Sequence, residues 1–322
     1  MAVNVTLRSI DAATYAAEVL PLTAELWAGE RSLHGYVEQT AQIARCGYGR
    51  RHYRTVGLYD GASLVASFKR YERTLRAGSQ RLRATGIGAV FTPREFRGRG
   101  YASAMLAMEL DRSLADGVDL AFLFSDIEPR FYTSLGFVTM PSRSMSLRAD
   151  NLPATRIEVA GLDGRDWIGV QRCFELGERH RPWAFVRTPL VWEWLRLRMR
   201  QASEHRAGIE TNLVVRRRRA IAAYVLGARA PHEDAYVLDE FGFADGEAAA
   251  VIPALLRSAA GDLRRITGWL PVESAREALP RASVRKRTKA LFMVAPLSAA
   301  AKRWVKEAAA ANTDGVWSTD HI

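Results

Sequence analysis

The stretch at residues 85–109, TGIGAVFTPREFRGRGYASAMLAME, passes from an apolar strand-like run through a cluster of arginine and glycine into a helix of small residues. A helix that follows a strand and a glycine-rich turn presents unpaired backbone N–H groups and the positive end of its dipole. Gly98 and Gly100 let the backbone approach a pyrophosphate without a Cβ clash, and Arg97 and Arg99 add charge and fork-shaped donors. The segment therefore predicts an anion-binding loop.

Composition limits the kind of protein that carries this loop. The chain has 322 residues, of which 48% are hydrophobic and 25% charged, the profile of a soluble globular protein of about two domains. The sequence shows neither a membrane-length apolar run nor a signal peptide, so we expect no membrane partner and a cytoplasmic location. The two cysteines, Cys46 and Cys173, lie far apart and indicate neither a disulfide framework nor a metal site.

The positive charge of the chain does not by itself indicate a nucleic-acid partner. The net charge of +11 is spread over both halves, and no nucleic-acid-binding motif is present, so an anionic small ligand fits equally well. The one dense basic run, residues 216–219, lies between two apolar strand-like segments. This position favours a solvated hairpin turn, with a docking patch as the alternative.

The order of predicted elements repeats once along the chain. The first 150 residues read as helices, a three-strand meander, a helix, a strand, a short helix and further strands, and the second half follows a similar order without the Arg/Gly cluster. The expected helices are at 12–30, 35–45, 128–136, 167–180, 188–201, 247–260 and 298–311, besides the helix after the Arg/Gly cluster. The expected strands are at 54–59, 62–73, 80–92, 119–125, 136–140, 143–149, 209–216, 220–227, 235–241, 264–270 and 290–297. A polar segment at 149–159 places a domain boundary near residue 152.

Three classes of anion-binding loop compete for the cluster. A Walker loop needs Lys and then Ser or Thr, which do not follow Gly100, and a dinucleotide fingerprint needs a third glycine where Ser103 stands. The pattern R-x-x-G-x-A is met by Arg97, Gly100 and Ala102, and FYTSLGF follows at residues 131–137. Together these two motifs resemble those of the GNAT (Gcn5-related) acyltransferases. One departure is a spacing from proline to arginine that is one residue longer than usual.

The resemblance implies a fold, a co-substrate and a set of site residues. The fold would be α/β, with two GNAT-like domains in tandem, each a mixed, mostly antiparallel sheet flanked by helices, the second degenerate. Acetyl-CoA would lie where the strands at 86–92 and 119–125 separate, and no metal is implied. The implied cofactor-binding residues are Ala89, Val90, Phe91, Arg97, Gly98, Arg99, Gly100, Tyr101 and Ala102. Tyr132 falls at the position of the family's general acid, with a core tyrosine as the alternative interpretation.

The C-terminal tail VWSTDHI carries Trp317, which favours a docked rather than a frayed end. With the two motifs, this tail resembles tandem-domain acetyltransferases, among them the fungal lysine N6-acetyltransferases and, more distantly, the Eis aminoglycoside-acetylating proteins. In the Eis proteins the terminal carboxylate sits in the acceptor site, which here implies the α-carboxylate of Ile322, with Asp320 and His321 beside it. An ordinary docked tail is the alternative.

Acyl transfer to an amine requires a group that accepts a proton, and the sequence leaves this base open. The candidates are the Ile322 carboxylate, His321, Asp126, Glu128 and a chain of water molecules. Several aromatic residues are candidates for lining an acceptor cleft or, alternatively, for a core: Trp27, Trp183, Trp192, Trp194 and Tyr236.

These observations predict an acetyl-CoA-dependent N-acetyltransferase. Residues 1–152 would form the catalytic domain, and residues 153–322 a degenerate copy that completes the acceptor pocket, with residues 315–322 as its tail. The expected acceptor is the primary amine of a small molecule, with free lysine, a similar amino acid or a polyamine favoured. A protein lysine or N-terminus and a non-catalytic acyl-CoA sensor are the alternatives. A homo-oligomer is compatible with the sequence.

Overall fold

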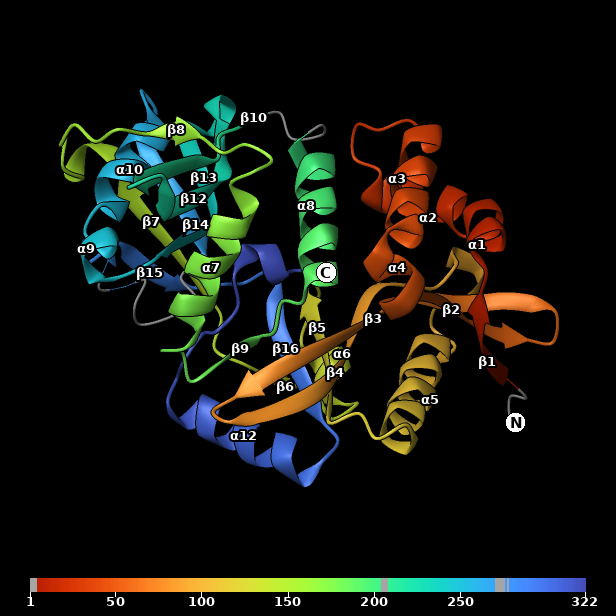
Figure 1. The fold of residues 1–322 in the computed structure, drawn as a ribbon. Coiled ribbons are helices and arrows are strands. Elements are labelled where there is room, and N and C mark those ends of the chain that lie inside the picture. Colours follow the sequence, from red (N-terminus) through yellow and green to blue (C-terminus); the bar gives the residue numbers. More distant parts are fainter. Residues whose placement is uncertain (1–4, 204–207, 270–275, 277) are drawn as a thin grey trace.

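A computed structural model describes residues 5–203, 208–269, 276 and 278–322 of the chain. The described strands form two sheets of eight strands each, and helices pack against both (Figure 1). The predicted α/β class, with two mixed and mostly antiparallel sheets in tandem, is confirmed. None of the helices in these ranges combines the length and the apolar character that a membrane span requires.

The first sheet has the strand order β1-β2-β3-β4-β5-β16-β6, and β9 pairs with β3. All its pairs are antiparallel except β4 with β5, which is parallel. Its strands are β1 (Val5–Ile10), β2 (Tyr53–Asp60), β3 (Ser63–Ala77), β4 (Gln80–Phe91), β5 (Leu120–Ser125), β6 (Val138–Thr139), β9 (Trp183–Phe185) and β16 (Leu291–Pro296). The meander of β2 to β4 follows the predicted strands closely.

The second sheet repeats this plan. Its order is β15-β7-β14-β13-β12-β11-β8, with β10 paired to β12, and its parallel pair is β13 with β14. Its strands are β7 (Arg143–Arg148), β8 (Ala160–Gly161), β10 (Ile209–Glu210), β11 (Leu213–Arg217), β12 (Ala220–Ala230), β13 (Ala235–Phe243), β14 (Arg265–Trp269) and β15 (Ser283–Lys286). Residue 270 of the strand predicted at 264–270 lies outside the described residues.

The two sheets exchange strands. β7, from the first half of the chain, pairs with β14 and β15 in the second sheet. β16, from the second half, lies between β5 and β6 in the first sheet. The sequence boundary placed near residue 152 stays a prediction, since the strands of each sheet come from both sides of it. Each sheet therefore needs the other half of the chain to be complete.

Helices cover both sheets and fill the space between them. The main helices are α1 (Ala12–Glu18), α2 (Leu20–Trp27), α3 (Leu33–Arg45), α4 (Gly47–His52), α5 (Tyr101–Ala115), α6 (Arg130–Thr133), α7 (Trp167–Glu178), α8 (Pro189–Ser203), α9 (Gly246–Ala249), α10 (Ile252–Ala260) and α12 (Ala299–Ala310). Two predicted helices are each divided in the structure. Pro21 and Pro253 stand in the first turn of α2 and α10, where a missing N–H is tolerated and a new helix begins.

A second departure from the predicted elements lies at the edge of the second sheet. The strand predicted at 209–216 is interrupted between β10 and β11, because the side chain of Asn212 accepts a hydrogen bond from the Gly227 N–H at 2.9 Å. The basic run follows as the turn of the β11–β12 hairpin, in which Arg218 and Arg219 are exposed and have φ of 49° and 69°. The predicted hairpin turn is confirmed.

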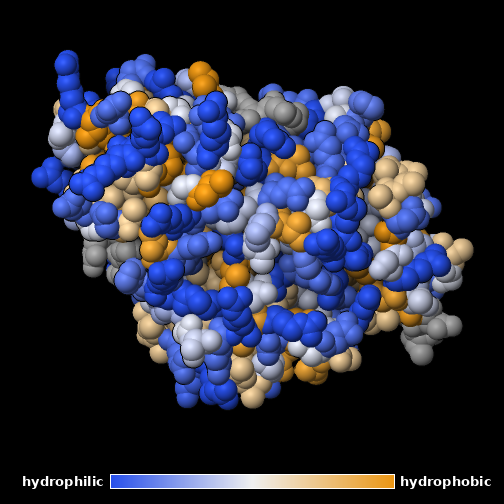
Figure 2. Space-filling view, in the orientation of Figure 1, coloured by the Kyte–Doolittle hydropathy of each residue, from blue (hydrophilic) through white to orange (hydrophobic). Residues whose placement is uncertain are grey.

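The helix α8 lies between the two halves, and the C-terminus ends beside it at the centre of the molecule (Figure 1). Trp194 stacks on Tyr48 of α4, with ring centroids 4.8 Å apart, while Trp192 meets Phe174 of α7 edge-on at 5.2 Å. Both tryptophans are buried because α8 has a partner on each side. The outer surface is mostly polar, with apolar residues in small separate groups on the face seen in Figure 2.

A buried ion pair holds α5 against the first sheet. The Arg70 Nε atom on β3 donates to Glu109 Oε1 on α5 at 2.8 Å, and the Glu109 side chain is fully buried. Arg70 also binds Glu72 at 2.7 Å, but the side chain of Glu72 is 48% exposed. Removing the buried partner leaves a buried guanidinium charge uncompensated, whereas the exposed partner is largely replaced by water.

We expect Glu109→Gln, which keeps the side-chain shape, to lower the free energy of unfolding by about 3 kcal/mol. The matched control Glu72→Gln removes the exposed partner of the same arginine and should cost less than about 1 kcal/mol. Urea denaturation of the three proteins measures both values. Equal losses in the two variants would contradict the role of the buried pair.

Candidate active site

The parallel strands β4 and β5 pair with each other over only a short stretch. They pair at Ala84, Thr85 and Gly86, and no further pair follows. Ala89 adopts a left-handed conformation with φ of 49°, and the register with β3 shifts around it. The bulge turns the end of β4 away from β5, so the backbone of the predicted pantetheine-binding residues Ala89, Val90 and Phe91 lies beyond the last residue paired with β5.

The Arg/Gly loop connects this opening to α5. Gly98 and Gly100 have φ of 76° and 81°, a region that favours glycine, and Gly100 caps α5 without a side-chain hydrogen bond. The N–H groups of the first turn of α5, which includes Tyr101 and Ala102, are thus left for a ligand. Arg97 and Arg99 are exposed beside them.

The long spacing before Arg97 has a structural explanation. The extra residue is accommodated by a 3-10 turn at Arg94–Phe96, after which the Arg97 Nε atom donates to the Thr92 carbonyl at 3.1 Å. The first residue of α5 is fixed separately, since the Tyr101 hydroxyl donates to Asp60 Oδ2 at 2.7 Å. The loop is therefore held at both ends, and its residues fit an anionic ligand.

The corresponding helix start in the second sheet cannot take the same ligand. Asp245 precedes α9, and its Oδ1 atom accepts the Ala248 N–H at 2.7 Å. A carboxylate already satisfies this N-terminus and repels a phosphate, and Glu247 adds a second negative charge in the first turn. The second copy is degenerate in charge as well as in sequence.

Tyr132 is the third residue of the short helix α6. Its side chain is buried, its ring meets Phe131 edge-on at 4.9 Å, and its hydroxyl forms no hydrogen bond within the described ranges. Burial, reinforced by the nearby Asp126 carboxylate, raises the pKa of Tyr132 to about 12. The phenol therefore stays protonated at neutral pH and can donate its proton.

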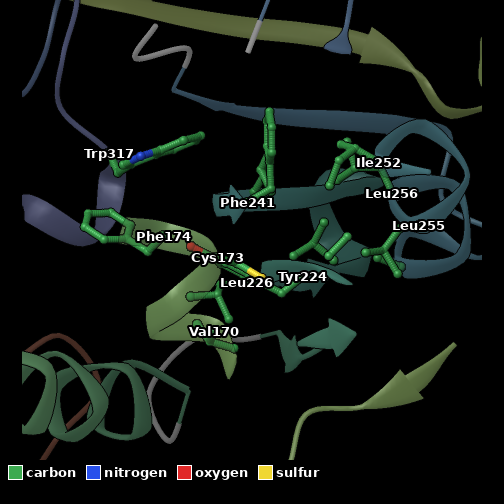
Figure 3. Packing of buried hydrophobic residues seen from close by; sticks show 14 of the residues in the cluster. Val170, Cys173, Phe174, Tyr224, Leu226, Phe241, Ile252, Leu255, Leu256 and Trp317 are labelled. Atoms are coloured by element: carbon green, nitrogen blue, oxygen red, sulfur yellow. The ribbon is translucent and has the colours of Figure 1, made fainter. Parts of the chain in front are cut away.

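The tail is docked between the two halves, as predicted from Trp317. Trp317 is buried edge-on against Phe241, with ring centroids 5.2 Å apart, near Phe174 (Figure 3). Asp320 is buried and pairs with Arg73 at 3.3 Å and Arg187 at 3.2 Å. Although burial opposes the charged form, the two arginines hold the pKa of Asp320 below its usual value.

Further contacts continue along the tail to its last residues. Thr319 Oγ1 donates to Glu240 Oε2 at 2.5 Å, and Ser318 Oγ donates to Asp239 at 3.0 Å. The Arg198 guanidinium donates to the carbonyl oxygen of His321. Strand β13 and helix α8 therefore both contribute to the position of the terminal carboxylate.

The final residue, Ile322, lies on β4 at the point where β4 and β5 separate. A Cβ atom placed on Gly86 would be 2.6 Å from Ile322 Cδ1, and one placed on Gly88 would be 3.6 Å from the terminal carboxyl carbon. The two glycines allow the chain end to lie directly on the strand. The structure brings the predicted residues Ile322 and Ala89 to the same short part of β4.

The other candidate bases differ in their surroundings. The His321 ring lies between Phe124 at 4.9 Å and Trp269 at 5.9 Å, and burial, with Arg198 adding to it, lowers its pKa to about 4. Such an imidazole is a weak base. Asp126 is exposed, accepts the Ala290 N–H at 2.9 Å and acts electrostatically on both Tyr132 and His321. Glu128 is exposed, and its carboxylate contacts none of the described site residues.

Most of the aromatic residues considered for the acceptor cleft belong to cores. Trp183, Trp192, Trp194 and Tyr236 are buried. Trp27 is only partly buried and meets Phe91 of β4 edge-on, with ring centroids 6.3 Å apart. Of this group, Trp27 is the residue that borders the opening.

Sequence reasoning missed the charged groups that hold the tail. Arg73 comes from β3, Arg187 and Arg198 from the β9–α8 region, and Glu240 from β13. None of them stands in a motif, and each looks like a surface residue in the sequence. Among the described residues, no group of three or more His, Cys, Asp or Glu side chains is placed to hold a metal ion.

Close packing of the chain end on Gly86 predicts that a side chain there displaces the tail. We expect Gly86→Val to make the tail at least roughly tenfold more susceptible to carboxypeptidase, since overpacking costs about 1–3 kcal/mol. The control is Gly164→Val, because a Cβ at Gly164 meets no atom within 4 Å. Equal digestion of both variants would show that the chain end does not depend on contact with β4.

The buried imidazole predicts a pH dependence of stability. The pKa of His321 is lowered from 6.5 to about 4 in the fold, so between these values the unfolded chain binds a proton that the folded chain does not. Stability is therefore lost as the pH falls from 6.5 to 4. We expect His321→Phe to abolish up to about 3 kcal/mol of this loss, measured by urea denaturation at pH 7 and pH 4.5. Arg198, Arg287 and Asp126 face the ring and remain in both proteins.

Comparison with known proteins agrees with the geometry. Residues 14–140 match the family model of the acetyltransferase (GNAT) domain. No curated protein sequence matches the chain.

Among solved structures, a GCN5-related N-acetyltransferase from Kribbella flavida is 19% identical with a TM-score of 0.68, over 92% of this chain and 73% of that one. Eis1 from Mycobacterium abscessus is 15% identical with a TM-score of 0.62, over 91% and 74%. A tandem GNAT protein from the clavulanic acid biosynthesis pathway is 13% identical with a TM-score of 0.52, over 92% and 99%. The chain therefore carries a GNAT acetyltransferase domain within a tandem GNAT-like fold, which implies acyl transfer from acyl-CoA.

Proposed function

We propose that the protein transfers the acetyl group of acetyl-CoA to a primary amine of a small molecule, with free lysine favoured. The observation that carries the proposal is the position of the Ile322 carboxylate on β4, at the point where β4 and β5 separate. The Ile322 carboxylate, which accepts a proton, and the Tyr132 phenol, which donates one, would then flank one opening. The fungal lysine N6-acetyltransferases, which the sequence resembles, motivate the choice of lysine.

The co-substrate would be held by backbone groups and by the Arg/Gly loop. The N–H groups at the start of α5, with Arg97 and Arg99, suit a pyrophosphate. The edge of β4 beyond its last pair with β5 suits the amide groups of a pantetheine arm. Acetyl-CoA supplies the thioester whose carbonyl carbon receives the amine. The residues present fit this ligand, because glycines leave the loop backbone accessible.

The Ile322 carboxylate would accept the proton of the acceptor ammonium. An amine of the lysine type has a pKa near 10.4, so its neutral form costs roughly 4–5 kcal/mol at pH 7. A carboxylate placed on Gly88 lies where the amine must enter, and a water molecule can relay the proton. Asp126 is the alternative acceptor, since it lies on the Tyr132 side of the same opening.

Tyr132 would donate the proton that the departing group needs. The amine nitrogen bonds to the carbonyl carbon, the carbon–sulfur bond breaks, and the thiolate takes the phenolic proton of Tyr132. The proton removed from the amine restores the phenol, so the products are an amide and a free thiol. Because the pKa of Tyr132 is about 12, the proton is available throughout the neutral range.

The second half of the chain would complete the acceptor pocket. Its helix α8 supplies Arg198, which binds the His321 carbonyl, and its strand β13 supplies Asp239 and Glu240, which bind the tail. We propose that residues 153–322 serve the active site in this way and that residues 1–152 carry the chemistry. A protein lysine or N-terminus is the alternative acceptor.

The first experiment is thiol release from acetyl-CoA with a panel of lysine, ornithine, polyamines, an aminoglycoside and a lysine peptide. We expect one small amine to turn over and Tyr132→Phe to lower kcat about 100-fold or more at every pH from 6 to 9. Adding one glycine after Ile322 displaces the carboxylate without removing the tail contacts, and we expect a similar loss. Tyr59→Phe is the control, since the Tyr59 ring packs against Arg8, whose guanidinium carbon lies 3.7 Å from the ring centroid.

Each outcome bears on a different part of the proposal. Full activity of the extended chain would exclude the Ile322 carboxylate as the base. Full activity of Tyr132→Phe would exclude the phenol as the acid. Acetyl-CoA binding without turnover of any amine would instead favour a sensor of acyl-CoA.

A further inference from the structure

A cluster of tyrosines surrounds one lysine on the face of the first sheet that lies away from α5. The lysine is Lys69 on β3, which pairs with Thr55 on one side and Gly88 on the other. The Lys69 Nζ atom lies 5.9 Å from the ring centroid of Tyr15 on α1 and 5.9 Å from that of Tyr36 on α3. The residue as a whole is partly buried, and its ammonium group lies inside this cluster of rings.

The ammonium of Lys69 lacks a negative partner. Within the described part of the chain it forms neither a hydrogen bond nor an ion pair, and the Ile322 carboxylate is beyond ion-pair distance. Its closest charged influences are the guanidinium groups of Arg198 and Arg31, both positive. Burial, with these two cations, lowers the pKa of Lys69 to about 8, which measures how little the fold itself stabilises its charge.

Two neighbouring hydroxyls also lack partners. The hydroxyl oxygens of Tyr15 and Tyr53 are buried without a hydrogen bond to any described residue. Tyr53 packs on Tyr71 across the strands β2 and β3, with ring centroids 5.2 Å apart. Because burial raises the pKa of Tyr53 far above its usual value, its phenol remains a donor. An unpaired buried hydroxyl is costly, so such groups commonly mark a place where a ligand or a water molecule binds.

The cluster adjoins the proposed acceptor position. Gly88, the β4 partner of Lys69, is the residue on which the terminal carboxyl carbon of Ile322 lies. The Tyr71 ring is on the same side, 3.2 Å from a Cβ placed on Gly88. Directly paired residues on neighbouring strands lie about 5 Å apart, so one small molecule can reach both the Ile322 carboxylate and Lys69.

We propose that Lys69, with the hydroxyls of Tyr15 and Tyr53, binds an anionic group of the amine acceptor, a carboxylate or a phosphate. This inference rests on the proposed acetyl transfer and specifies the class of its substrate. The acceptor carries an amine at the Ile322 end and a negative charge at the Lys69 end. Such an anionic group needs several hydrogen-bond donors, which the Lys69 ammonium and the two phenolic hydroxyls provide.

The charge arrangement also excludes a class of acceptor. A diamine or polyamine that enters with one amine at Ile322 would carry its second ammonium toward Lys69, Arg198 and Arg31. Like charges in a partly buried site repel strongly, because water screens them poorly there. The site therefore discriminates between an amino acid and the amine formed from it by loss of carbon dioxide.

The test compares acceptors that differ only in the anionic group. Steady-state acetylation is measured for lysine against cadaverine, and for phosphoethanolamine against ethanolamine, with saturating acetyl-CoA. The proteins are the wild type, Lys69→Gln, Lys69→Arg and Lys302→Gln, in which the altered lysine is exposed on α12. Circular dichroism and thermal unfolding establish that each variant is folded.

We expect Lys69→Gln to raise KM for the acceptor with the anionic group at least about tenfold and to change KM for the matched amine without that group less than about threefold. The value of kcat should stay nearly unchanged. Lys69→Arg should restore most of the affinity, and Lys302→Gln should behave as the wild type. Tyr15→Phe should weaken only the anionic acceptor. The lysine pair tests recognition of a carboxylate, and the phosphoethanolamine pair tests recognition of a phosphate.

Two results would overturn the inference, and a third would instead address the proposed function. Equal KM values for lysine and cadaverine in the wild type would show that the site does not recognise the negative charge of the acceptor. Equal effects of Lys69→Gln on both members of a pair would assign Lys69 a structural role. Absence of turnover with every amine would contradict the proposed acetyl transfer, and isothermal titration of lysine into wild type and Lys69→Gln would then decide the anion site alone.

Discussion

A buried network of charges around Asp320 holds the two halves of this chain in register. Asp320 lies between Arg73 of the first sheet and Arg187, which in turn binds Glu240 of the second sheet at 2.7 Å. Arg187 also lies over the Phe174 ring at 3.8 Å. Buried charges are costly unless each is compensated, so the network forms only when both sheets and the tail are in place. The position of the chain end thus depends on the fold of the whole molecule.

The tail connects equivalent places in the two sheets. Both sheets contain one parallel pair, β4 with β5 and β13 with β14. Ser318 binds Asp239 on β13, and four residues later Ile322 lies on β4 at Gly86 and Gly88. In the second sheet Asp245 satisfies the helix start that would otherwise attract an anion. The first sheet thus keeps a helix start without a capping side chain, while the second sheet supplies contacts that hold the tail.

Local sequence signals were sufficient for many single elements and turns, but not for the exchange of strands between the sheets or for the support of the tail. The meander, the glycine-rich turn before α5 and the basic hairpin turn depend on residues near one another in the chain, so periodicity and glycine placement identified them. The exchange of β7 and β16 between the sheets depends on contacts across more than a hundred residues and carries no local signal. The roles of Arg73, Arg187 and Lys69 were missed for the same reason, since a buried charge and an exposed one look alike in a sequence.

The charges at the opening narrow the chemistry left open by the sequence. In the proposed acetyl transfer, lysine, other amino acids and polyamines all offer a primary amine for the Ile322 carboxylate, so the amine alone does not separate these acceptors. The other end of the proposed acceptor does separate them, because Lys69 is positive there and the described residues place no carboxylate in contact with it. A zwitterionic acceptor satisfies both ends, whereas a polyamine satisfies one and is repelled at the other. The Ile322 carboxylate lies on β4, and Lys69 belongs to the neighbouring strand β3. The match of an acceptor to these two charges is thus a stronger criterion for its identity than the shape of the cleft.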